Sequence, residues 1–182
     1  MGDFHSFLMS KAMPALRHVP GASLGASALR PARVLLVDDS RGDLILAKRC
    51  LLGPSGLGCE LTTAQSSSEG LDILLRASAA GTPIDLVLLD INMPRADGFV
   101  MLDHIRGHAS LHKTPVIMCT GSNHDIDRRH ARMLGAVGYI VKPASLEGIR
   151  DILELLPLFD ISEDAPGLRL MTVAPDRWAL DA

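Results

Sequence analysis

Short runs of consecutive apolar residues recur along this chain and alternate with segments in which apolar residues return every three or four positions. The runs predict strands at residues 33–37, 58–63, 85–89, 115–119 and 138–141, of which 58–63 is the weakest. Helical periodicity predicts helices at about 41–52, 67–79, 98–107, 124–134 and 145–156. Runs rich in Val, Ile and Leu without alternation are typical of strands buried on both faces. Their strict alternation with helices predicts an α/β fold with a parallel sheet between two helical layers.

Polar residues and proline mark the ends of several predicted helices. Ser40 and Asp43 have the spacing of a capping box before the first helix, as Ser66 and Glu69 have before the second. Pro157 ends the last helix, because proline has no backbone N–H to donate.

A second pattern concerns the residues directly after the strands. Asp38 and Asp39 follow the first strand, Asp90 the third, Thr120 the fourth and Lys142 the fifth. The carboxyl ends of parallel strands share one edge, where open α/β sheets bind their ligands. We therefore expect three carboxylates, a hydroxyl and an ammonium group to converge there. Neighbouring carboxylates repel one another unless one is protonated or a cation binds, and a few carboxylates with retained waters suit Mg²⁺.

Each of these residues also has an ordinary structural explanation when it is taken alone. An acid at a strand end often caps the next helix, a threonine there is commonly structural, and Lys142-Pro143 can be a simple turn. The functional interpretation depends on all of them falling at matching strand ends.

The composition is that of a globular domain with extensions. Of the 182 residues, 47% are hydrophobic and 3% aromatic, so the core is expected to consist of aliphatic side chains, alanine and methionine. No apolar stretch approaches the roughly 18 residues that cross a bilayer. Three scattered cysteines fit neither a disulfide framework nor a zinc cluster, and a net charge of −3 disfavours binding to nucleic acid. We expect a cytoplasmic protein without membrane or nucleic-acid partners.

The predicted elements divide the chain into three parts. Residues 1–31 are expected to form a disordered N-terminal arm, residues 32–157 one globular domain, and residues 158–182 a C-terminal tail. The tail is expected to be mostly flexible, with Trp178 as a hydrophobic anchor and with a short strand possible at 168–173. An arm that covers a sheet edge or forms a dimer is the alternative.

Four motifs together resemble the receiver domain of bacterial two-component response regulators. They are Val34-Leu35-Leu36-Val37-Asp38-Asp39-Ser40, then Leu89-Asp90-Ile91-Asn92-Met93-Pro94 with Asp97-Gly98, then Thr120, and Gly138-Tyr139-Ile140-Val141-Lys142-Pro143. Thr120 lies 30 residues and Lys142 lies 52 residues after Asp90. The resemblance covers about residues 32–157. The stretches 78–84 and 111–115 resemble the stand-alone receivers that partner phytochrome-type kinases, whereas Gly121 replaces the small alanine that is common in the family.

The resemblance implies a fold and a set of roles. It implies a flavodoxin-like sheet with strand order 2-1-3-4-5 and Asp90 as the residue that accepts a phosphoryl group. Asp38, Asp39, Asp90 and the backbone carbonyl of Asn92 would bind Mg²⁺. Lys142 and Thr120 would contact the phosphoryl oxygens, Thr120 and Tyr139 would form a switch pair, and the Lys142–Pro143 bond would be cis.

The resemblance also implies partners and a way of signalling. A sensor histidine kinase or a histidine phosphotransfer protein would supply the phosphoryl group. The response would reach the face formed by the helix at 124–134, the strand at 138–141 and the helix at 145–156, which is also the expected homodimer interface. The expected protein is a single-domain response regulator and not an enzyme.

Two alternative functions remain open at this stage. One is a phosphohydrolase of the haloacid dehalogenase kind with Asp90 as its nucleophile, although that family places the nucleophile after its first strand and an acid two residues later. The other is a degenerate receiver that docks to a partner without being phosphorylated.

Overall fold

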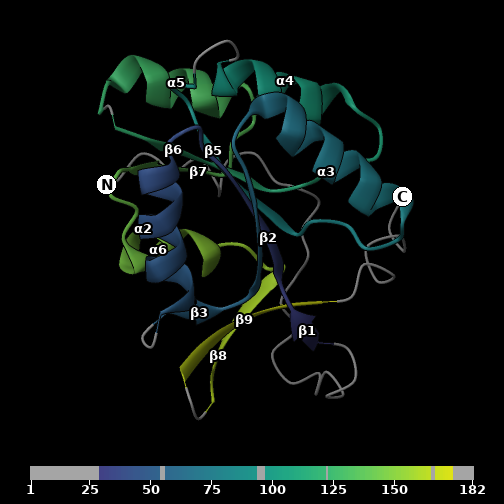
Figure 1. Ribbon diagram of the computed structural model, residues 1–182, viewed down its shortest axis with the longest axis vertical. Coiled ribbons are helices and arrows are strands. Elements are labelled where there is room, and N and C mark those ends of the chain that lie inside the picture. Colours follow the sequence, from purple (N-terminus) through teal and green to yellow (C-terminus); the bar gives the residue numbers. More distant parts are fainter. Residues whose placement is uncertain (1–28, 54–55, 94–96, 122, 165–166, 174–182) are drawn as a thin grey trace.

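Five parallel strands form the central sheet of the computed structural model, which describes residues 29–53, 56–93, 97–121, 123–164 and 167–173. Their order across the sheet is β4-β2-β5-β6-β7 (Figure 1). The strands are β2 (Arg33–Val37), β4 (Glu60–Ala64), β5 (Leu86–Asp90), β6 (Val116–Thr120) and β7 (Gly138–Val141). Counted along the chain as first to fifth, they have the order 2-1-3-4-5, so the predicted flavodoxin-like fold is confirmed.

Two layers of helices enclose this sheet. Helices α2 (Arg41–Leu52) and α6 (Leu146–Leu153) cover one face, and α3 (Ser67–Ala79), α4 (Gly98–Gly107) and α5 (Asp125–Met133) cover the other (Figure 1). Successive strand residues point to opposite faces. Leu35 and Val37 therefore pack with the core of the α3, α4 and α5 layer, whereas Val34 and Leu36 pack with that of α2 and α6.

The element boundaries follow the sequence pattern closely, with two informative differences. Helix α6 ends at Leu153 and not near residue 156, because the residue before Pro157 is disfavoured in helical conformation. The strand predicted at 58–63 is divided into β3 (Leu57–Gly58), which pairs outside the central sheet, and β4, which forms an edge of it. The polar residues Thr62 and Thr63 are exposed on this edge strand.

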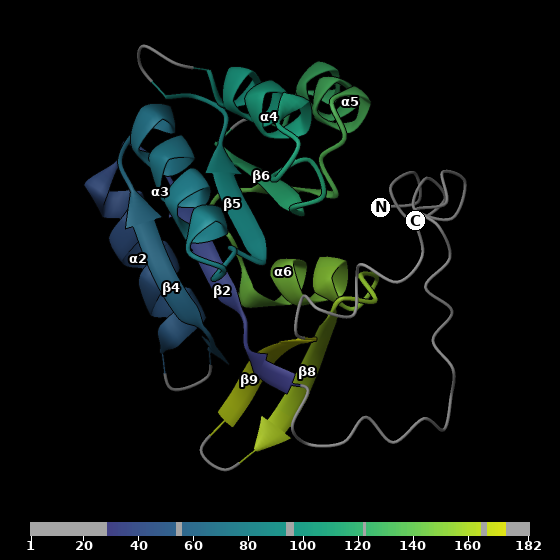
Figure 2. The same ribbon diagram turned by 90° about the vertical axis from the view of Figure 1, so that its right-hand side faces the viewer.

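The C-terminal segment differs from the flexible tail that its composition predicts. Strand β8 (Phe159–Asp164) and strand β9 (Gly167–Val173) form an antiparallel hairpin. Along its other edge, β9 pairs with β1 (Leu29–Pro31) and β3, giving a second, four-stranded sheet (Figure 2). The possible strand near 168–173 is thus present, and the expectation of flexibility is wrong for the hairpin. Of the disordered arm predicted over residues 1–31, residues 29–31 instead form strand β1, and residues 1–28 lie outside the described residues, as does Trp178.

The hairpin is ordered because it completes the core beneath α6. Leu170 of β9 and Leu57 of β3 are buried in the same apolar cluster as Ala32, Leu153 and Leu156. In Figure 2 the hairpin lies beside β1, at the end of the molecule below α6. Burial of these side chains offsets the conformational entropy lost in ordering the segment.

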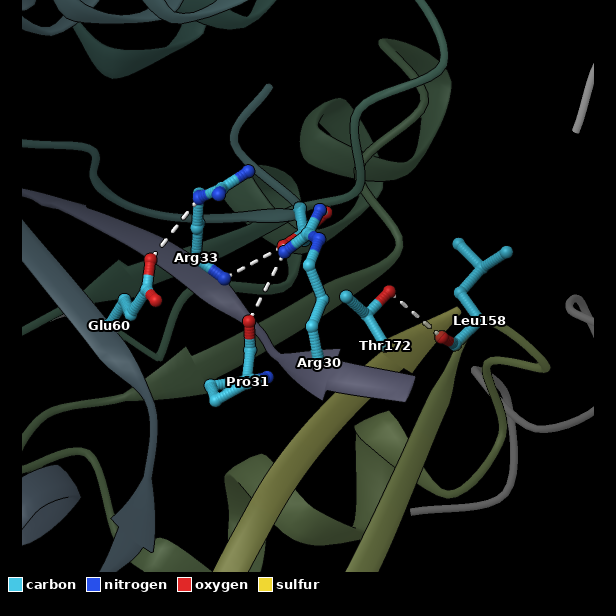
Figure 3. A network of polar contacts seen from close by, with 7 residues as sticks. Arg30, Pro31, Arg33, Glu60, Leu158 and Thr172 are labelled. Atoms are coloured by element: carbon cyan, nitrogen blue, oxygen red, sulfur yellow. Dashed lines mark hydrogen bonds and ion pairs between the residues drawn. The ribbon is translucent and has the colours of Figure 1, made fainter. Parts of the chain in front are cut away.

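Arg30 joins β1 to Asp85, directly before β5 of the central sheet, through a partly buried ion pair. Its guanidinium nitrogens Nη1 and Nη2 donate to the two carboxylate oxygens of Asp85 at 2.7 and 2.8 Å. Figure 3 shows Arg30 near Arg33, whose side chain contacts Glu60. Asp85 also accepts from the backbone N–H of Arg33 at 2.7 Å, and its side chain is only 11% exposed. By contrast, the ion pair between the Arg33 side chain and Glu60 joins a 26% exposed group to a 59% exposed one.

We expect Arg30→Ala to lower the free energy of unfolding by about 2–3 kcal/mol, because it leaves the Asp85 carboxylate partly buried without its cation. Arg33→Ala is the matched control, since it removes a more exposed ion pair and retains the backbone bond to Asp85. Its expected cost is under about 1 kcal/mol. Urea denaturation of both variants measures the difference. Equal losses would show that the Arg30–Asp85 pair does not anchor β1.

Candidate functional site at the carboxyl edge of the sheet

Asp38, Asp90 and Lys142 meet at the carboxyl edge of the central sheet. Asp38 directly follows β2, Asp90 is the last residue of β5 and Lys142 directly follows β7. The ammonium Nζ of Lys142 lies 2.6 Å from Oδ2 of Asp38 and 3.1 Å from Oδ2 of Asp90. The two carboxylate residues are 2% and 4% exposed. The sheet therefore brings residues 52 and 104 positions from Lys142 into direct contact with it.

Asp38, Asp39 and Asp90 form an arrangement that fits a metal ion. A carboxylate oxygen from each of them lies within 4.8 Å of the others, and Asp39 is the exposed member of the set. All the donors are carboxylate oxygens, as hard divalent cations prefer, and the exposed side leaves room for waters. These residues fit Mg²⁺.

Burial shapes the electrostatics of Asp38. Removal from water raises the pKa of its carboxyl above the ordinary value, and the nearby charge of Asp90 acts in the same direction. The ammonium of Lys142 and the backbone N–H of Ser40, which donates to Oδ1 at 2.9 Å, oppose this rise. A positive charge beside Asp38 favours the ionised form of its carboxyl, as the Lys142 ammonium does here.

Lys142 is held by a third carboxylate that the strand-end pattern does not reveal. Its ammonium lies 2.9 Å from Oδ2 of Asp43, in the first turn of α2. Burial alone would lower the pKa of Lys142. The hydrogen bonds to Asp38 and Asp43, with the negative charges of Asp90 and Asp38, outweigh this effect and raise the pKa above its ordinary value.

Asp43 was identified in the sequence only as a capping residue, and it has that position too. Its backbone N–H donates to the Ser40 hydroxyl at 3.2 Å. The same spacing is the signal that could have placed Asp43 in the site, because the first turn of a helix that follows β2 lies above the carboxyl edge of the sheet. Sequence reasoning missed this role.

Asn92, Thr120 and Tyr139 form a chain of contacts on the other side of Asp90. The backbone N–H of Asn92 donates to Oδ1 of Asp90 at 3.4 Å, and its side-chain amide donates to the Thr120 hydroxyl at 3.3 Å. Thr120 is fully buried, and a hydrogen bond links it to Tyr139. The proposed coordination of a metal by the backbone carbonyl of Asn92 stays a prediction.

The ring of Tyr139 is buried, and the guanidinium carbon of Arg128 lies 5.2 Å from its centre. Burial raises the pKa of the Tyr139 phenol, and the charge of Asp127 adds to the rise. The charge of Arg128 and the hydrogen bond to Thr120 act in the opposite direction. The phenol therefore stays protonated at neutral pH, and its oxygen shares a hydrogen bond with the Thr120 hydroxyl.

Two further features lie beside Lys142. The Lys142–Pro143 peptide bond is cis, as the resemblance implied. A cavity of about 420 Å³ opens between α2 and the segment that leads into α6, and Asp38, Asp43 and Lys142 form its polar part. Its other walls are mainly apolar, and include Leu46, Cys50, Cys119 and Ile149.

Among the described residues, no helix is both long and apolar enough to span a membrane.

The central domain of the chain is similar to known proteins. Residues 34–154 match the family described as the response regulator receiver domain. The protein PilG of Pseudomonas aeruginosa is 32% identical over 115 residues, which cover 63% of this chain and 79% of PilG. The matched region is a smaller part of other curated relatives, for example 25% of one and 43% of another.

The chain is also similar to the solved structures of response regulators. The bacteriophytochrome response regulator AtBRR aligns with a TM-score of 0.63 at 29% identity, covering 72% of this chain and 96% of its own. The phosphorylated cyanobacterial phytochrome response regulator RcpA aligns with a TM-score of 0.57 at 29% identity, covering 68% of this chain and 89% of its own.

Proposed function

The chain belongs to the response regulator receiver domain family, and on this basis we propose that Asp90 accepts a phosphoryl group from a sensor histidine kinase or a histidine phosphotransfer protein. The observation that carries the proposal is the position of Asp90, whose carboxylate lies 3.1 Å from the Lys142 ammonium and belongs to the three-carboxylate set.

The proposed reaction needs little from the protein beyond positioning and charge. An oxygen of the Asp90 carboxylate attacks the phosphorus of a phosphohistidine in line, the new O–P bond forms, and the N–P bond to the imidazole breaks. Lys142 neutralises charge on the phosphoryl oxygens, and Thr120 offers its hydroxyl to them. Mg²⁺ held by Asp38, Asp39, Asp90 and the Asn92 carbonyl would neutralise the remaining negative charge.

Thr120 and Tyr139 would transmit the change at Asp90. A phosphoryl group adds about −1.5 to −2 charge, if aspartyl phosphate behaves like other phosphorylated side chains. Movement of the Thr120 hydroxyl toward it would alter the Thr120–Tyr139 hydrogen bond. Tyr139 lies on β7 and contacts Arg128 of α5. The face of α5, β7 and α6 would then change its affinity for a target, or for a second copy of the chain in a homodimer.

Within this proposal the chain acts in the cytoplasm as a single-domain response regulator. The alignment with two phytochrome response regulators supports a phytochrome-type kinase as the partner. The alternative phosphohydrolase is disfavoured, because Asp90 ends the third strand of the sheet along the chain and Asn92 lies two residues later.

Phosphoryl uptake from a small-molecule donor tests the proposal. With acetyl phosphate and Mg²⁺, the intact mass of the protein should rise by one phosphoryl group, and excess EDTA should suppress the rise. The absence of any adduct over a range of donor concentrations would support the docking protein that is never phosphorylated. Sustained release of phosphate from p-nitrophenyl phosphate would favour the phosphohydrolase.

A further inference from the structure

The position of Lys142 creates a conflict at the centre of the proposed site. Its ammonium contacts Asp38 and Asp90, and both carboxylates also belong to the set that fits a metal ion. A dication and an ammonium group repel each other, and they would compete for the same oxygens. The contacts with Asp38, at 2.6 Å, and with Asp90, at 3.1 Å, are both subject to this competition.

Asp43 gives the Lys142 ammonium a carboxylate partner for which the metal ion does not compete. Its carboxylate lies 2.9 Å from Lys142 Nζ and is not a member of the three-carboxylate set. It comes from α2, whereas the set comes from the ends of β2 and β5. The cavity between α2 and the segment leading into α6 borders Lys142 and Asp43, so the lysine side chain has space on the α2 side.

We infer that Asp43 is a positioning residue that holds the Lys142 ammonium when the metal is bound, and so raises the affinity of the site for Mg²⁺. When the metal binds, the ammonium loses its contact with Asp38. It stays paired with Asp43, is not transferred to solvent and remains close enough to contact Asp90. The ammonium then interacts with fewer carboxylates, so its contact with Asp43 becomes stronger. This stronger contact stabilises the metal-bound protein and therefore tightens Mg²⁺ binding. The inference rests on the proposed function for its metal, and it assigns Asp43 a role in addition to capping α2.

A double-mutant cycle on Mg²⁺ affinity, measured by calorimetry without any phosphoryl donor, isolates this role. The four proteins are wild type, Asp43→Asn, Lys142→Met and the double variant. We expect Asp43→Asn to weaken Mg²⁺ binding about fivefold when Lys142 is present. In the Lys142→Met background the same change should cost less than about twofold, which is the effect of one exposed charge.

Two controls separate positioning from helix capping and from charge alone. Asp125→Asn also removes an acid from the first turn of a helix, α5, but Asp125 does not belong to the three-carboxylate set. The Mg²⁺ affinity of this variant should equal that of wild type. In the metal-free protein, NMR of the Lys142 side chain should show the Cε–Hε signals shifted by Asp43→Asn and restored toward the wild-type position by Asp43→Glu.

The outcomes are distinguishable. Equal losses from Asp43→Asn in the lysine and methionine backgrounds would overturn the inference, because Asp43 would then act only as a diffuse charge. No loss in either background would overturn it as well. Failure of the wild-type protein to bind Mg²⁺ would refute the metal requirement of the proposed function and the inference together, whereas wild-type binding without coupling would refute the inference alone.

Discussion

Asp90→Asn should reduce phosphoryl uptake from acetyl phosphate by at least about 10³-fold, because the amide oxygen is a much weaker nucleophile than the carboxylate it replaces. The same substitution removes a negative charge that lies close to the buried Asp38 carboxylate, and that charge raises the pKa of Asp38. We therefore expect the variant to fold at least as stably as the wild type. Intact-mass measurements over time, combined with thermal denaturation, check both expectations.

Asp103→Asn is the matched control for this experiment. Asp103 is an exposed acid on α4, away from the three-carboxylate set, and its removal changes the net charge equally. It should accept phosphoryl groups at the wild-type rate. If Asp90→Asn took up the label as fast as the control, the nucleophile would have to be another residue.

Gly98→Ala should destabilise the protein by about 3 kcal/mol and impair phosphoryl uptake, because the added methyl group has no space. A Cβ on Gly98 would lie 2.1 Å from the backbone carbonyl oxygen of Asp90 and 3.0 Å from Cα of Ile91. These are backbone atoms, so the start of α4 or the end of β5 must shift. The Gly98 N–H bond to the Ile91 carbonyl, 2.9 Å long, would be strained by the same movement.

Gly107→Ala, at the other end of α4, provides the comparison. A Cβ on Gly107 would meet no atom within 4 Å. Since alanine has a higher helix propensity, this variant should gain up to about 1 kcal/mol. Urea denaturation of both variants and their uptake of phosphoryl groups measure the contrast. Wild-type stability in Gly98→Ala would show that the close approach of α4 to Asp90 is not required.

The central fold could be predicted because its signals are local. Four of the five strands are unbroken apolar runs buried on both faces, and the polar residue at the end of each marks the carboxyl edge. Ser66 and Asp97 mark the starts of α3 and α4 by their side-chain caps. Because the strands are parallel, Asp38, Asp90 and Lys142 lie at the same edge of the sheet. This can be predicted without knowing the distances between the strands.

The second sheet could not be predicted, because its stability comes from distant segments. Residues 159–173 contain several acids and a Pro-Gly pair, which by themselves are typical of a flexible tail. These residues are ordered because β9 pairs with β1 and β3. The hairpin also packs on apolar residues under α6, among them Ala32, Leu57 and Leu156. Asp43 was missed for a related reason. Its contact with Lys142 joins residues 99 positions apart, and a capping role already accounted for it.

Locating the phosphoryl group in the wild-type protein tests the central claim most directly. After incubation with acetyl phosphate and Mg²⁺, reductive trapping of the acyl phosphate followed by peptide mass spectrometry should place the modification on Asp90, and nowhere else in the peptides that carry Asp38, Asp39 and Asp43. A modification on one of these other carboxylates, or on a histidine, would contradict the account.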